Sequence, residues 1–170
     1  MPDRRGAEFD DFVRMRSTAL LRVAYLLAGD RHAAEDLLQE VLEQMYVHWS
    51  RIHTAPEAYA RRALVNRSTN RWRWRGRRPE TALAHHDVAE PDHSDDVVIR
   101  DTVVAALREV PPRQRAAVVL RYLEDLPIAE VAVALDCSEG AVKSNTSKGL
   151  DRLRAALVPA STTTLAERGT

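Results

Sequence analysis

The spacing of apolar residues is the feature that most constrains the fold, because these residues recur three and four positions apart along most of the chain. Phe9, Leu20 and Leu27 follow this spacing near the N-terminus, and Val103 and Leu107 follow it in the second half. β-branched residues form no cluster, whereas Ala, Leu, Arg and Glu, which favour helices, dominate the composition. The chain is therefore predicted to be all-α.

The helical spacing is interrupted once, by a stretch in which prolines, acids and histidines replace it. A chain of 170 residues has room for a small domain on each side of this stretch. We therefore expect two small helical domains joined by an acidic flexible linker, the second being a helix-turn-helix domain. The expected boundaries are 7–78 for the first domain, 79–96 for the linker, 97–157 for the second domain and 158–170 for a disordered tail.

Local signals predict where several helices begin and end. Gly29 suits the left-handed conformation that ends a helix, and Asp30 suits the N-cap of the next one. Pro56 suits the first turn of a third helix, after a break at residues 50–55. A further helix is expected over about residues 113–123, after two consecutive prolines.

The formal net charge of zero conceals an uneven distribution. Nine arginines oppose two glutamates within residues 51–80, whereas six acids oppose one arginine within residues 81–101. Charge blocks of this kind report on binding partners more than on the fold.

Several classes of protein are disfavoured. The single cysteine, Cys137, allows neither an intrachain disulfide nor a cysteine-based zinc site. No apolar run reaches the roughly 18 residues that cross a bilayer, and the charged N-terminus does not resemble a signal peptide. No nucleophile elbow or phosphate-binding loop is present. The sequence thus predicts a cytoplasmic protein that is not an enzyme. We expect it to bind no cofactor, no membrane and no small-molecule substrate.

A metal site is the one enzymatic feature that the residue types allow. His85, His86, Asp87, Asp92 and His93 are ligands by type. Their stretch has no helical or strand periodicity to fix a coordination geometry, so we predict no metal.

Residues 128–157 have the pattern of a helix-turn-helix, with helices over about 128–135 and 139–157 around a short turn. Ser138 suits the N-cap of the second helix. Polar side chains on one face of that helix would meet base edges in a major groove, although the same face suits a solvated three-helix bundle. The candidate DNA-binding residues here are Ser138, Lys143, Ser144, Asn145, Ser147 and Lys148.

A basic stretch with interleaved tryptophans forms the second part of the third expected helix, over residues 66–78. Guanidinium groups bind phosphates, and indole rings stack on bases that are exposed when strands part. The alternative is that the tryptophans pack and the arginines only solvate a helix end. The candidate residues are Asn66, Arg67, Asn70, Arg71, Trp72, Arg73 and Trp74.

Four polar residues fall on one helical stripe near the start of the chain: Asp36, Gln39, Glu40 and Glu43. We call them the acidic stripe. A stripe this regular suits docking to a basic partner, but its spacing alone also fits a solvated face.

The order of these motifs resembles the extracytoplasmic-function (group 4) sigma factors of the sigma-70 family, of the small type found in actinobacteria. The resemblance covers about residues 9–157. It rests on Ala-Glu-Asp-Leu-Leu-Gln-Glu at 34–40, on Pro-Pro-Arg-Gln-Arg at 111–115 with Arg-Tyr at 121–122, and on Cys-Ser-Glu-Gly-Ala-Val-Lys-Ser at 137–144.

The resemblance implies a role for each motif. The acidic stripe would grip the clamp of the largest subunit of core RNA polymerase. Residues 59–78 would read and open the −10 element of promoter DNA, with Ile52 and His53 at the wall of a pocket for a flipped base. The last helix would read the −35 element, while Arg113 and Arg121 bind phosphates. Asn70 stands where many relatives have Asp, and Asp136 where Gly is usual.

Partners follow from the same resemblance: core RNA polymerase, promoter DNA and, as a further candidate, an anti-sigma factor. The alternative from another class is a freestanding helix-turn-helix regulator that binds DNA without docking to polymerase.

Overall fold

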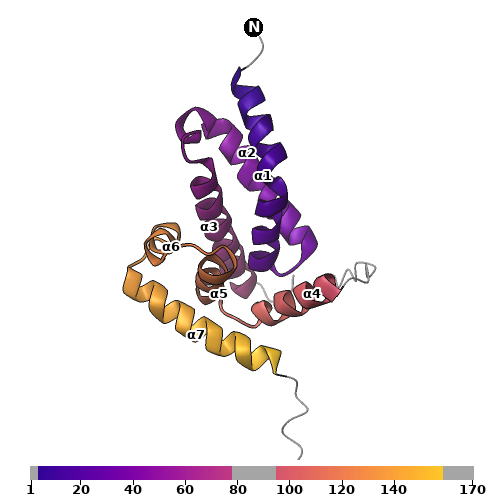
Figure 1. The fold of residues 1–170 in the computed structure, drawn as a ribbon, viewed down its shortest axis with the longest axis vertical. Coiled ribbons are helices and arrows are strands. Elements are labelled where there is room, and N and C mark those ends of the chain that lie inside the picture. The colour runs from indigo at the N-terminus through magenta and orange to yellow at the C-terminus, as the bar shows by residue number, and fades with distance from the viewer. Residues whose placement is uncertain (1–3, 78–94, 159–170) are drawn as a thin grey trace, which may run out of the picture.

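The computed structural model describes residues 4–77 and 95–158, and within these ranges it contains helices and turns but no strand (Figure 1). The first half consists of α1 (Arg4–Ala28), α2 (Arg31–Ile52) and α3 (Pro56–Arg77). The second half consists of α4 (Asp95–Arg108), α5 (Pro112–Val118), the π-helix η2 (Val119–Leu123), α6 (Ile128–Leu135) and α7 (Glu139–Leu157). The predicted all-α fold is confirmed.

The helix ends of the first half follow the local signals. Gly29 has a φ of +84° and ends α1, while the Asp30 side chain accepts a hydrogen bond from the Ala33 amide at 2.8 Å and caps α2. One boundary was predicted wrongly, because α2 continues to Ile52 instead of ending near residue 50. The Ile52 side chain packs against the core, which favours the extra helical residues. The predicted break at 50–55 is therefore only a short turn.

An aromatic cluster closes one end of the first half, where α1 and α2 pack together. The Phe9 ring lies edge-on to Tyr46 and to Trp49, with centroids 5.2 Å apart in both pairs. Edge-to-face contacts of this kind add to the burial of the rings. Further along, Leu37 of α2 and Leu64 of α3 are fully buried and fix α3 on α2.

The helix-turn-helix lies where it was predicted, with α6 and α7 beginning and ending at the expected residues. Asp136 adopts the left-handed conformation, with a φ of 50°, and ends α6. Gly149 is the contact between α7 and α5, since a Cβ there would lie 2.7 Å from Val118 Cγ2 and 2.9 Å from the Gln114 carbonyl oxygen. Only glycine lets the two helices approach this closely.

The helix expected over residues 113–123 begins as α5 but ends as the π-helix η2. The Glu124 amide donates to the Val119 carbonyl oxygen at 3.0 Å, five residues back, which is the π-helical spacing. Local sequence signals do not distinguish this ending from an α-helical one.

The two halves pack directly against each other through one continuous hydrophobic core. Arg115 of α5 is only 4% exposed, and its Nη1 donates to the Leu27 carbonyl oxygen at the end of α1 at 2.8 Å. Gly29 touches the stem of Arg108, which a Cβ would meet at 2.7 Å. We call this contact between α1–α3 and α4–α7 the inter-half interface.

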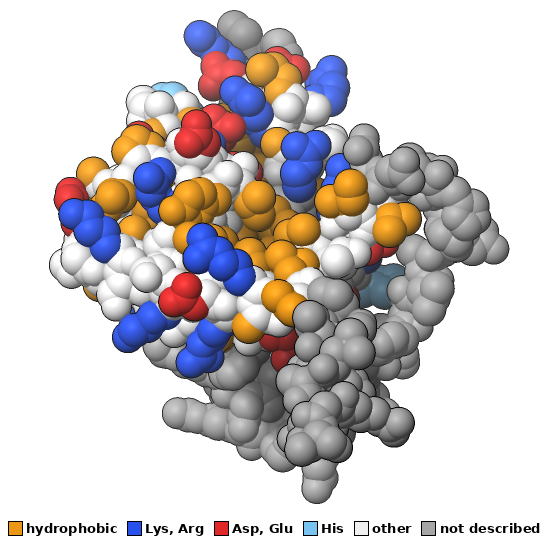
Figure 2. Space-filling view, turned by 60° about the horizontal axis from the view of Figure 1, so that its bottom comes forward, with side chains coloured by type: hydrophobic (Ala, Val, Ile, Leu, Met, Phe, Trp, Pro, Cys, Tyr) orange, Lys and Arg blue, Asp and Glu red, His pale blue; other side chains and the backbone are white. Residues whose placement is uncertain are grey.

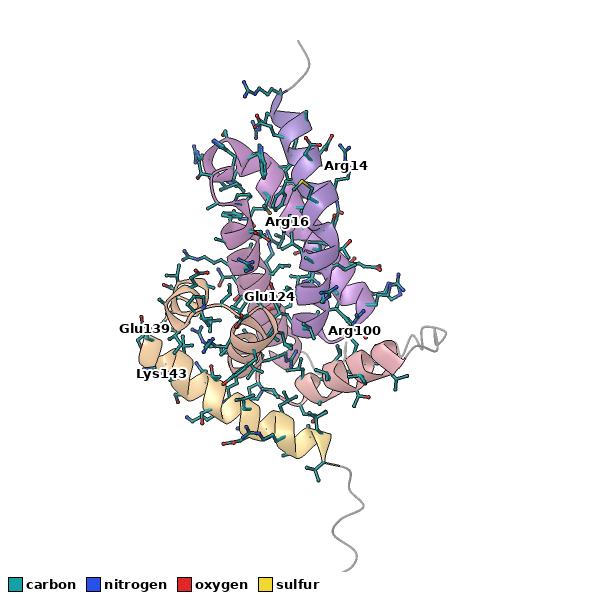
Figure 3. The ribbon with its side chains drawn as sticks, viewed as in Figure 1. Arg14, Arg16, Arg100, Glu124, Glu139 and Lys143 are labelled. Atoms are coloured by element: carbon teal, nitrogen blue, oxygen red, sulfur yellow. The ribbon has the colours of Figure 1, made fainter. Side chains whose placement is uncertain are left out.

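Two further pairs cross the inter-half interface. The Tyr25 hydroxyl donates to Asp101 at 3.1 Å, and burial together with this carboxylate raises the tyrosine pKa. Arg61 of α3 and Glu124 lie 3.6 Å apart, with side chains 20% and 21% exposed; Glu124 is labelled in Figure 3. The predicted linker lies outside the described residues except for 95 and 96, which begin α4, and the predicted tail lies outside them except for residue 158.

Candidate nucleic-acid and polymerase interfaces

The N-terminal half of α7 presents a polar face to solvent. Ser138 caps the helix by accepting a hydrogen bond from the Ala141 amide at 3.1 Å. The opposite face is buried through Val142, Thr146 and Gly149, so the helix is anchored from behind. On the outer face, Lys143, Ser144, Ser147 and Lys148 are exposed and Asn145 is half-buried. Figure 3 shows Glu139 and Lys143 at this end of α7. The predicted reading face is therefore accessible.

The charge on this face is modest. Lys143 and Lys148 form no ion pair with any residue in the described ranges, so both ammonium groups are available to a phosphate or a base. Figure 2 turns the lower side of the molecule, where α7 lies, toward the viewer and shows Lys and Arg side chains spread around a central hydrophobic group. The basic side chains are thus dispersed on this side of the molecule and do not form one continuous patch.

Arg113 and Arg121 each hold a neighbouring backbone segment. Arg113 Nη2 donates to the Leu135 carbonyl oxygen at 2.8 Å, and Arg121 Nη1 donates to the Leu126 carbonyl oxygen at 2.9 Å. A guanidinium has five N–H donors, so each arginine keeps donors for a phosphate. Their predicted phosphate contacts stay predictions, but the structure adds a role in fixing the helix-turn-helix.

The acidic stripe on α2 divides into two parts. Asp36, Gln39 and Glu43 are exposed, and the Gln39 amide nitrogen donates to Glu43 at 3.2 Å. Glu40 is half-buried because it turns toward α3. The acidic stripe was predicted as a single docking surface. In the structure three of its side chains face solvent, and the fourth, that of Glu40, faces α3.

Glu40 meets two arginines of α3 that were predicted to bind DNA. Arg67 Nη1 lies 2.8 Å from one carboxylate oxygen of Glu40, and Arg71 Nη2 bonds the other. Arg67 also donates to the Gln44 side-chain oxygen at 3.0 Å, and Arg71 to the Ala33 carbonyl oxygen at 3.3 Å. The predicted polymerase-binding and DNA-binding residues are therefore joined in one network.

The outward face of α3 carries Asn66 and Asn70, both exposed. Arg62 lies four residues before Asn66 and is exposed as well, with no ion-pair partner in the described ranges. Sequence reasoning missed Arg62, although its spacing from the two asparagines would have placed it on their stripe.

The remaining predicted residues on this side are placed less uniformly. His53 is exposed in the turn after α2, with Nδ1 3.1 Å from the Ser50 carbonyl oxygen. Ile52 is half-buried and packs against the core, so only part of its side chain is accessible. The backbone of residues 72–74 lies in α3, but the side chains of Trp72, Arg73 and Trp74 fall outside the described residues.

Other kinds of site find no support in the described residues. They contain no group of three or more His, Cys, Asp or Glu that would hold a metal ion, and the histidine-rich stretch considered above lies outside them. None of their helices combines the length and the apolar character needed to span a membrane.

Comparison with protein families finds two matches that together cover both halves. The sigma-70 region 2 model matches residues 12–78, and the sigma-70 region 4 model matches residues 100–153. The RNA polymerase sigma-E factor of Streptomyces coelicolor is 38% identical over 160 residues, which is 89% of this chain and 86% of the relative.

Two further proteins support the same assignment. The ECF RNA polymerase sigma factor SigM of Bacillus subtilis is 26% identical, over 86% of this chain and 93% of its own. The fold also matches sigma factor RpoE in its co-crystal structure with the anti-sigma factor NepR from Bartonella quintana. That match has a TM-score of 0.67 at 22% identity and covers 88% of this chain and 96% of the other. The chain therefore belongs to the sigma-70 family and is an RNA polymerase sigma factor of the extracytoplasmic-function type.

Proposed function

We propose that this sigma factor recruits core RNA polymerase through α2 and reads the −10 element with α3 and the −35 element with α7. Polymerase binding and −10 reading belong to a domain over residues 7–78, and −35 reading belongs to a domain over residues 97–157. The observation that carries the proposal is the accessible polar face in the N-terminal half of α7, because it stands on an anchored helix-turn-helix and its lysines, Lys143 and Lys148, make no ion pair in the described ranges.

On the −35 side, the exposed side chains of α7 have the chemistry of base-edge readers. Lysine suits the O6 and N7 acceptors of guanine, and serine hydroxyls serve as donors or acceptors. Ser138 and the first amides of α7 can meet a phosphate at the helix N-terminus. Lys143 and Ser144 are our primary candidates for base contacts, while Arg113 and Arg121 supply phosphate contacts.

On the −10 side, Arg62, Asn66 and Asn70 form an exposed stripe along α3 that suits contact with DNA. His53 in the preceding turn is accessible to a base, whereas Ile52 contributes mainly to packing. Trp72, Arg73 and Trp74 remain proposed DNA contacts by their chemistry, since indole rings stack on unpaired bases.

The accessible part of the acidic stripe, Asp36, Gln39 and Glu43, is the proposed docking surface for a basic face of the polymerase clamp. In this role the chain binds core polymerase and directs it to promoters, and the polymerase catalyses RNA synthesis. The proposal places the protein in the cytoplasm, where polymerase and promoters meet. The Bartonella structure holds its sigma factor with an anti-sigma factor, which makes such a regulator a candidate partner here.

The inter-half interface limits what the free protein can do. Promoter sites two helical turns apart are separated by roughly 70 Å, whereas α3 and α7 here belong to halves in direct contact. Simultaneous reading of both elements therefore requires the halves to separate. Core polymerase, which would hold each half on its own surface, supplies the separation.

The test is a footprint on a duplex promoter with the protein alone, with core polymerase alone and with both. We expect protection of both elements only when both proteins are present. Tight two-element protection by the protein alone would instead support a freestanding regulator and show that the halves separate without core polymerase.

A further inference from the structure

Glu40 lies between the acidic stripe of α2, which is proposed to bind core polymerase, and α3, which is proposed to bind the −10 element. Its helix, α2, carries the acidic stripe, and its carboxylate faces α3. Each oxygen accepts from a different arginine, Arg67 on one side and Arg71 on the other. No other carboxylate in the described ranges is paired with either arginine.

The two arginines are held back by these bonds. Arg67 directs Nη1 to Glu40 and both Nε and Nη2 to the Gln44 side-chain oxygen, at 3.3 and 3.0 Å. Arg71 directs one nitrogen to Glu40 and another to the Ala33 carbonyl oxygen. Arg67 thus has three of its five N–H donors, and Arg71 two, bonded to groups of α2, which leaves fewer donors for a phosphate.

The exposed stripe of α3 differs from these two arginines in its orientation. Arg62 and the two asparagines four and eight residues later point outward, whereas Arg67 and Arg71 point toward α2. The −10 surface thus carries less available positive charge than its sequence suggests. Glu40 is the group that accounts for the difference.

We propose that Glu40 is a positioning residue that withholds Arg67 and Arg71 from DNA in the free protein and releases them when a cationic group of the polymerase takes its carboxylate. This inference rests on the proposed function of α2 and α3. Both oxygens of the carboxylate already accept from the two arginines, so a further cationic group competes with them, and polymerase docking and DNA binding become coupled through Glu40. Linkage requires the coupling to act in both directions.

The first experiment measures how binding of the free protein to a short duplex of arbitrary sequence depends on salt, by fluorescence anisotropy. Glu40→Gln keeps the side-chain shape and removes the charge. The control is Glu35→Gln on the same helix, which also removes one negative charge and breaks an Arg–Glu pair, in this case the exposed one with Arg31. Thermal unfolding of each variant verifies that it is folded at the assay temperature.

We expect Glu40→Gln to steepen the slope of log K against log salt by about 1.8, because two released arginines neutralise two more phosphates at roughly 0.9 each. The slope of Glu35→Gln should stay that of the unmodified protein. Adding Arg67→Gln and Arg71→Gln to Glu40→Gln should remove the extra slope. Equal slopes for Glu40→Gln and Glu35→Gln would overturn the proposal and leave Glu40 a packing contact between α2 and α3.

The second experiment tests the coupling from the other side. The double variant Arg67→Gln/Arg71→Gln leaves Glu40 unoccupied, so its affinity for core polymerase without DNA should rise several-fold. Unchanged or weaker core binding would overturn the coupling.

Failure of the proposed function has a different signature. If the same double variant, bound to core polymerase, opens a promoter as well as the unmodified protein does, these arginines have no role on the −10 side. That result is independent of the two measurements on Glu40.

Discussion

The two helices proposed to read the promoter differ in what surrounds their polar side chains. On α7, Lys143 and Ser144 face solvent, and the helix is held only from its buried side. On α3, two of the arginines are bonded to α2, and Arg61 is paired with Glu124 of the other half. The proposed −35 reader therefore needs no change of partners before it binds, whereas the proposed −10 reader must first exchange the bonds of two arginines.

The difference lies at the surface and not in how firmly each helix is anchored. Leu64 beneath α3 and Val142 beneath α7 are both completely buried. The proposed exchange of partners changes the charge that α3 presents without moving the helix itself. The predictions below test these two statements, beginning with the anchor.

Leu64→Ala should lower the free energy of unfolding by about 2–5 kcal/mol, because it leaves a cavity where α3 packs on α2. Val133→Ala, at a position on α6 that is 66% exposed, is the matched control and should change stability little. Chemical denaturation gives both values. A loss below about 1 kcal/mol for Leu64→Ala would mean that α3 is not rigidly anchored.

Lys143→Ala should weaken −35 binding by about 1–3 kcal/mol and relax the preference for one base pair, as expected when a base contact is lost. Arg152→Ala, an exposed change further along α7, should weaken binding evenly across sequences or not at all. The measurement is binding of core polymerase with each variant to a panel of single-substitution promoters. If Lys143→Ala leaves the base preference unchanged, the residues that read the −35 element must lie elsewhere on α7.

The smallest effect concerns the pair between Arg61 and Glu124. A double-mutant cycle with Arg61→Gln and Glu124→Gln should give a coupling energy below about 1 kcal/mol, because both side chains keep contact with solvent. Even so, each variant should raise the fraction of molecules in which the two halves are separated. Resonance energy transfer between fluorescent labels on α1 and α7 would measure this fraction. No change in transfer would show that buried contacts alone hold the inter-half interface.

Local signals in the sequence were sufficient to predict much of the fold. Asp30, Ser138 and Asp136 act at helix ends through contacts within a few residues, so their effects can be read from the chain directly. The exposed face of α7 followed from the periodicity of the residues that it buries. The boundaries of α6 and α7 were correct for the same reason.

What the sequence could not provide depends on contacts between distant residues. Spacing placed Glu40 on a stripe but could not say that Arg67, 27 positions away, would turn it toward α3. The pairing of Arg115 with the end of α1 was equally invisible, since nothing nearby in the chain marks a buried arginine. Ile52 was misplaced because packing against the core, and no local signal, extends α2.

The hydrogen bond from Arg115 to Leu27 joins residues 88 positions apart and has a consequence for any partner that opens the molecule. Burial lowers the pKa of the Arg115 guanidinium to about 10, which still leaves the group protonated throughout the neutral range. Because both halves belong to one chain, re-forming the inter-half interface is an intramolecular step and is favoured over binding of a separate molecule. A partner that binds one half alone must compete with this intramolecular contact. A partner that binds both halves gains from the same effect, because binding of the first half keeps the second half close to it.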